Sequence, residues 1–134
     1  RLLAWETLCL GRPVMHERFD HGALDSLLHI VLPDEVGLHE RLRLEGGHLD
    51  KLGGHPLLAT FCAAPADQAV LEQVRPLLDE LGNPAGATLL GSLLVIRLLD
   101  HDNQHLQRTL QRLWHVLRPA ILGLPACPPR IWAT

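Results

Sequence analysis

Cysteine is scarce in this sequence, and the three cysteines form no framework. Cys9, Cys62 and Cys127 are widely spaced, and no two of them make a CxxC pair. A disulfide-stapled secreted fold needs an even, closely spaced set, and a thiolate metal site needs paired cysteines. We therefore expect reduced thiols in a cytoplasmic protein.

Long hydrophobic runs and an excess of positive charge are also absent. The longest apolar run, 89–96, is interrupted by Gly91 and Ser92 and is followed by Arg97. A membrane span needs about 18 apolar residues. Twelve Lys and Arg against 15 Asp and Glu give a formal net charge of -3, whereas nucleic-acid-binding domains tend to be basic. We expect no membrane partner and no nucleic-acid partner.

Catalytic signatures are missing as well. The sequence has no GxSxG, no HExxH, no P-loop and no GxGxxG. It has nine histidines, of which His101 and His105 have the i,i+4 spacing of a helical metal pair. A solvated helix start explains that pair more simply. No enzymatic activity is expected, and a small metal-dependent hydrolase or a purely structural β domain remain the alternatives.

The 134 residues predict one domain, 1–134, that is mainly β. The chain starts at Arg1 in a strand-like pattern, so we expect the C-terminal part of a longer protein whose N-terminal half is absent. Apolar spacing predicts a helix at 67–81, where Pro76 should kink or shorten it. A second helix is expected along the apolar stripe from Leu106 to Leu117, with Asp102 or Asn103 as cap and Arg118-Pro119 at its end. We expect an elongated antiparallel or β-helix-like assembly with two C-terminal α-helices, its strands being 1–10, 14–19, 24–32, 36–45, 57–63 and 88–99.

Three glutamates share the apolar faces of expected strands. Alternation puts Glu6, Glu17 and Glu40 each among apolar neighbours. A carboxylate is too costly to desolvate in a dry core without a partner. Either these glutamates form structural ion pairs, or they line a wet passage that attracts divalent cations without holding them tightly. The ion-pair interpretation is the simpler one, and the available arginines are Arg12, Arg18 and Arg97.

The last seven residues contain prolines, an arginine and a tryptophan, from Pro128 to Thr134. A large aromatic side chain so near a chain end is expected to be docked rather than free. We expect Trp132 to pack against the domain near the second helix, which carries Trp114. Arg130 is expected to anchor the tail through a carboxylate or a carbonyl.

Several short motifs occur in a fixed order along nearly the whole chain. They are Ala4-Trp5-Glu6, Leu10-Gly11-Arg12, Glu17-Arg18-Phe19, Glu40-Arg41-Leu42, Gly54-His55-Pro56, Gly86-Ala87-Thr88, Leu113-Trp114, Leu117-Arg118-Pro119 and the closing Pro129-Arg130-Ile131-Trp132-Ala133-Thr134. Each motif is weak alone. Together they resemble the C-terminal half of the UreD family of urease accessory proteins, called UreH in some organisms.

The resemblance implies a mostly β accessory protein without enzymatic activity. Such proteins act in urease maturation, and hence nitrogen metabolism, in the cytoplasm. They bind apo-urease and UreF, join the GTPase UreG through UreF, and act as chaperones in nickel insertion. Nickel binding would be transient, with no tightly bound cofactor, along a water-filled internal tunnel. Glu6, Glu17 and Glu40 lie in family-like motifs, so we expect them to line part of that nickel route.

Overall fold

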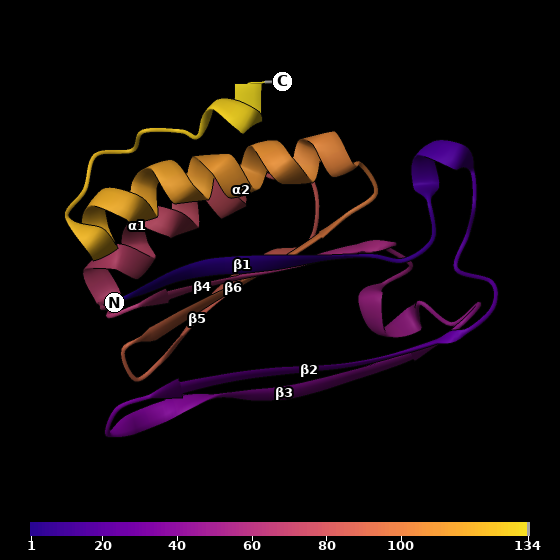
Figure 1. The fold of residues 1–134 in the computed structure, drawn as a ribbon, viewed down its shortest axis with the longest axis horizontal. Coiled ribbons are helices and arrows are strands. Elements are labelled where there is room, and N and C mark those ends of the chain that lie inside the picture. The colour runs from indigo at the N-terminus through magenta and orange to yellow at the C-terminus, as the bar shows by residue number, and fades with distance from the viewer. Residues whose placement is uncertain (134) are drawn as a thin grey trace.

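The computed structural model describes residues 1–133 and arranges them in three layers (Figure 1). Two helices form one outer layer, a four-stranded sheet forms the middle layer, and a two-stranded hairpin forms the other outer layer. The strands and helices are β1 (Leu2–Cys9), β2 (Ala23–Leu32), β3 (Glu35–Glu45), β4 (Leu57–Ala64), α1 (Gln68–Asp79), β5 (Ala85–Leu90), β6 (Leu93–Asp100) and α2 (Asn103–Leu117).

The middle sheet has the strand order β1-β4-β6-β5, and every neighbouring pair is antiparallel. All eight residues of β4 are buried, because a layer covers each face of this central strand. The register places Glu6 of β1 opposite Thr60 of β4, and Thr60 opposite Arg97 of β6. These three residues therefore form one row across the sheet, on a single face.

The helical layer packs on one face of this sheet. Each helix begins at an aspartate that caps it: the Asp67 side chain accepts a hydrogen bond from the backbone N–H of Val70, and the Asp102 side chain accepts one from Gln104. α1 continues through Pro76 to Asp79. Within residues 1–133, neither helix is long and apolar enough to cross a bilayer.

The hairpin of β2 and β3 packs on the opposite face of the sheet. Burial alternates along β2, so that Leu28 and Ile30 face the sheet while Leu27 and His29 face outward. Ile30, Leu32 and Leu38 of the hairpin pack with buried residues of β4 and β6. Apolar side chains therefore fill the space between the sheet and the hairpin towards both of its ends, in one cluster around Leu44 and Leu58 and another around Cys62 and Leu93.

The predicted class is confirmed: the chain is mainly antiparallel β with two late helices. Two strand predictions are wrong. The segment 14–19 is a short 3₁₀ turn, Pro13–Met15, followed by a single bridge from Arg12 to Glu17. The segment 88–99 is two strands, because Gly91 adopts a left-handed φ of 59° and reverses the chain between β5 and β6.

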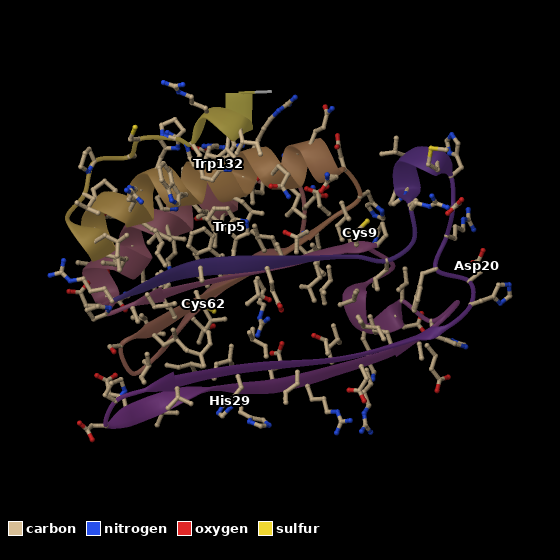
Figure 2. The ribbon with its side chains drawn as sticks, in the orientation of Figure 1. Trp5, Cys9, Asp20, His29, Cys62 and Trp132 are labelled. Carbon is tan, nitrogen blue, oxygen red and sulfur yellow. The ribbon has the colours of Figure 1, made fainter. Side chains whose placement is uncertain are left out.

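The C-terminal tail folds back onto the helical layer. The Trp132 ring centroid lies 5.0 Å from that of Trp114 and 5.8 Å from that of Trp5, and the Arg118 guanidinium lies 5.0 Å above the Trp114 ring. Figure 2 shows Trp132 and Trp5 on this helical side of the sheet. Arg130 is exposed, and its side chain makes no polar contact within residues 1–133, so its anchoring role stays a prediction. Thr134, the last residue of the closing motif, lies outside the described residues.

Replacing the docked tryptophan should loosen the tail. We expect Trp132→Ala to lower the free energy of unfolding of the full-length protein by about 2 kcal/mol, less than a fully buried tryptophan would cost. Urea denaturation measures the change. Leu124→Ala, in the same tail and 48% exposed, should cost less than about 0.5 kcal/mol. Equal losses in the two variants would mean that Trp132 does not anchor the tail.

Candidate functional site

A cleft of about 630 Å³ lies between the middle sheet and the hairpin. Its walls are mostly apolar and come from β1, β2 and β4, with Leu28 and Ile30 on the hairpin side. Glu6 and Cys62 line it from the sheet side, and Figure 2 labels Cys62 in the space between the two layers. The half-buried side chain of Glu6 thus lies in a cleft whose walls are mostly apolar.

Beyond Glu6 the space becomes very narrow. A second, small cavity of about 10 Å³ is lined by Glu6, Glu40, Thr60 and Arg97. A cavity of roughly 10 to 15 Å³ is the least that holds one water molecule. Glu6 therefore borders both the wide cleft and a constriction where at most one water fits.

An ion pair across the two layers forms this constriction. Nη2 of Arg97, on β6, donates to Oε2 of Glu40, on β3, at 2.5 Å, and Nη1 of Arg97 donates to the Thr60 hydroxyl. The Arg97 and Glu40 side chains are 29% and 42% exposed. Because the guanidinium bonds to both layers, it ties the hairpin to the sheet as well as neutralising Glu40.

Glu6 differs from Glu40, because no positive side chain pairs with it. Within residues 1–133, Glu6 makes no hydrogen bond or ion pair through its carboxylate. It is half-buried, and Arg97, in the same row, lies two strands away and is engaged by Glu40. A solvated carboxylate next to a paired one can attract divalent cations without a fixed coordination shell.

Glu17 lies outside this cleft. In the turn after β1, it accepts two hydrogen bonds from Arg12, at 2.6 and 2.8 Å, and both side chains are more than half exposed. Glu17 borders a different hollow of about 620 Å³, at the other end of the sheet. Strand alternation predicted that all three glutamates line one interior. The structure brings together only Glu6 and Glu40, because the segment 14–19, which carries Glu17, is not a strand.

Cys62 is the thiol that lines the cleft. Burial raises its pKa to about 11, and the nearby negative charges of Glu6 and Glu40 add to that effect against the opposing charge of Arg97. The side chain therefore stays a neutral thiol near pH 7, and a neutral thiol is a poor metal ligand. The oxygen ligands of the cleft, rather than its sulfur, are the groups available to a cation.

His101 and His105 do not form a joint site. His105 Nδ1 lies 2.6 Å from Oδ2 of the buried Asp100, whereas the His101 ring packs on the His55 ring with centroids 4.3 Å apart. Burial alone would raise the Asp100 pKa, but hydrogen bonds from the backbone of Asp102, from His105 and from the backbone of His101 hold it below its ordinary value. Within residues 1–133, no three His, Cys, Asp or Glu side chains converge on a metal position.

The sequence offered Arg97 as one of three available partners but did not assign it to Glu40. A signal was present, because Thr60 and Arg97 are the polar residues inside the apolar segments 57–63 and 93–99. Polar residues inside buried strands must find partners. What the sequence could not supply was the register that aligns Thr60 with Arg97 and the packing that brings Glu40 to them.

Comparison with known proteins places the chain in a family. The family model described as UreD urease accessory protein matches residues 1–133. Over all 134 residues, the chain is 97% identical to a urease accessory protein UreD of Pseudomonas putida and 48% identical to one of Enterobacter sp., covering 48% and 49% of those proteins. It is 45% identical to a UreD of Klebsiella pneumoniae, covering 50% of it. The chain thus spans about half the length of the curated relatives it matches, and it belongs to the UreD family of urease accessory proteins.

Proposed function

We propose that this chain is part of a non-enzymatic scaffold that helps deliver nickel to apo-urease. The scaffold would bind apo-urease and UreF, and through UreF the GTPase UreG, in the cytoplasm. Membership of the UreD family supports this role, as do relatives named as urease accessory proteins. The lack of any known catalytic motif in the sequence favours a scaffold over a hydrolase.

The observation that carries the proposal is the unpaired Glu6 in the cleft between the sheet and the hairpin. A metal in transit needs ligands that attract it but release it, and a few oxygen ligands bind Ni²⁺ less tightly than imidazole or thiolate sites do. We propose that Glu6 and Glu40 line part of the nickel route. Glu17, which pairs with Arg12 on the surface, is not part of this route.

The Glu40–Arg97 pair gives the route a control point. A fixed guanidinium repels a divalent cation, so passage beyond Glu6 requires Glu40 to exchange Arg97 for the metal or for water. The 10 Å³ constriction at these residues is too small for a hydrated ion. Movement of the hairpin relative to the sheet would therefore accompany transfer.

Conservative variants test this role. Glu6→Gln and Glu40→Gln would be introduced into the full-length protein and co-expressed with urease and its other accessory proteins. Each lost carboxylate contact, worth about 1 kcal/mol, should lower the nickel content of the purified urease roughly fivefold. Metal analysis of the urease gives the result.

Two controls make the result specific. Glu17→Gln, a matched change at an exposed paired glutamate, should leave nickel loading normal. Co-purification of each variant with UreF and apo-urease should be unchanged, which separates loss of transfer from loss of assembly. Normal nickel content in both Glu6→Gln and Glu40→Gln would refute the route, and failure of the unsubstituted protein to bind UreF or apo-urease would refute the scaffold.

A further inference from the structure

Two histidines face each other on the outer surface of the hairpin. His29 of β2 and His39 of β3 are directly opposite in the antiparallel register, and both are exposed. Their ring centroids are 4.9 Å apart, with the ring planes at 64°. Figure 2 shows His29 on the side of the hairpin away from the middle sheet. His29 also borders the cleft of about 630 Å³, whereas His39 does not.

The separation of the rings suits one metal ion bound by both. A metal bound by an imidazole nitrogen at about 2.1 Å lies about 3.2 Å from the centre of that ring. When the nitrogen–metal–nitrogen angle is between about 90° and 109°, the two ring centres lie roughly 4.5 to 5.2 Å apart. The observed 4.9 Å lies inside this range. The two strands already hold the rings at this spacing, so the backbone needs little rearrangement on binding.

Both imidazoles are also free to bind. Within residues 1–133, neither His29 nor His39 makes a hydrogen bond or an ion pair through its ring. Asp25, an acid on the same exposed face of β2, is engaged by two arginines: it accepts hydrogen bonds from Arg41 at 2.7 and 2.6 Å and from Arg43 at 3.3 Å. Because its carboxylate is bonded to these arginines, Asp25 does not serve as a third ligand. A metal ion at the pair would bind imidazole nitrogens as its protein ligands.

We propose that His29 and His39 form a two-imidazole site for a borderline divalent transition metal, such as Ni²⁺, Cu²⁺ or Zn²⁺. Imidazole is a preferred ligand of these ions. The remaining coordination positions face solvent, where water completes the shell. Because metal-bound histidines normally gain strength from a hydrogen bond on the second nitrogen, and neither ring has one, the site is weaker than a closed three- or four-ligand site.

The site uses different residues from the nickel route proposed above, which depends on Glu6 and Glu40, although His29 also borders the cleft. Its test needs only the purified full-length protein. Ni²⁺ is titrated by calorimetry into the unsubstituted protein and into His29→Gln, His39→Gln and His48→Gln. His48 is an exposed histidine outside the strands whose ring has no partner within the described chain, so it is the matched control.

We expect His29→Gln and His39→Gln each to weaken one Ni²⁺ binding event by about tenfold or more, the scale on which altered metal shells lose affinity. His48→Gln should bind like the unsubstituted protein. A metal bridging β2 and β3 binds only the folded hairpin, so Ni²⁺ should also raise the Tm, and both variants should lose that increase. Glutamine at an exposed position changes stability little by itself, so a Tm difference seen only with metal reports the site.

Three outcomes would overturn the proposal. Unchanged Ni²⁺ affinity in both His29→Gln and His39→Gln would mean that the rings only pack against each other. A loss in one variant alone would mean that no chelate forms. Binding of one metal per two chains, accompanied by dimerisation, would mean that the metal bridges molecules rather than strands. If Glu6→Gln and Glu40→Gln still bind Ni²⁺ at His29 and His39, the two-histidine site is supported even when the proposed nickel route is refuted.

Discussion

Replacing Phe61 by alanine should lower the free energy of unfolding by about 4 kcal/mol, the largest loss expected from a single substitution here. Phe61 is fully buried at the centre of β4, and its ring stacks on Trp5 with centroids 5.2 Å apart. Truncation would leave a cavity between the sheet and the helices that neither rigid layer can close. Urea denaturation of the full-length protein, followed by circular dichroism, measures the loss.

Two variants calibrate that result. Phe61→Leu keeps most of the apolar volume and should cost about 1 to 2 kcal/mol. Leu27→Ala, on the outer face of the hairpin and 60% exposed, should change stability by less than about 0.5 kcal/mol. A loss below about 1 kcal/mol for Phe61→Ala would show that the helices do not form a close-packed layer on the sheet.

Arg97→Met should be the second most damaging change, at about 2 to 3 kcal/mol. Methionine keeps much of the apolar stem but removes both hydrogen bonds, to Glu40 and to Thr60. The Glu40 carboxylate would then stay half-buried with no cation, beside the unpaired Glu6. The cost comes mainly from that uncompensated charge and is reduced by the partial exposure of the pair. Urea denaturation again gives the value.

A double-mutant cycle identifies the cause of the loss. If the unpaired charge is responsible, Arg97→Met combined with Glu40→Gln should be more stable than Arg97→Met alone, with a coupling of about 1 to 2 kcal/mol. The exposed Arg12–Glu17 pair is a matched control, and Arg12→Met should cost less than about 1 kcal/mol. Strict additivity of Arg97→Met and Glu40→Gln would contradict the structural role of the ion pair.

The sequence predicted the helices and most strands because their signals are local. Asp67 and Asp102 mark the helix starts, and the apolar stripe of α2 is uninterrupted. Pro76 was expected to kink or shorten α1, and the helix ends at Asp79, three residues beyond Pro76 and two before the predicted end at residue 81. A proline inside a helix removes one backbone hydrogen bond to the preceding turn and so destabilises the helix. Packing of α1 on the sheet stabilises the helix beyond what its intrinsic propensity indicates.

The sequence could not predict where single apolar segments turn. The segment 88–99 is apolar on both sides of Gly91, so its pattern fits one buried strand or two. Only the sheet shows that β5 returns along β6. The apolar pattern likewise did not show that the segment after Pro13 turns. Alternation therefore placed Glu17 with the other glutamates, whereas the turn carries Glu17 to the surface.

The candidate site needed long-range information of another kind. Alternation correctly put Glu6 on the same face as Leu2 and Leu8. Yet both faces of the sheet are covered, so alternation could not say which face meets the helices and which meets the hairpin. The meeting of Glu40 with Arg97 depends on residues 57 positions apart in the chain, and loop closure over that distance leaves no local trace.

The distribution of aromatic side chains has a practical consequence for spectroscopy. Trp5, Trp114 and Trp132 are the tryptophans of this chain, which has no tyrosine, and their rings contact one another in the helical layer. Emission from these indoles reports mainly on that layer and the tail, and none of the three tryptophans lies on the hairpin. Movement of the hairpin is therefore followed more directly by a reporter added on the hairpin or by amide hydrogen exchange.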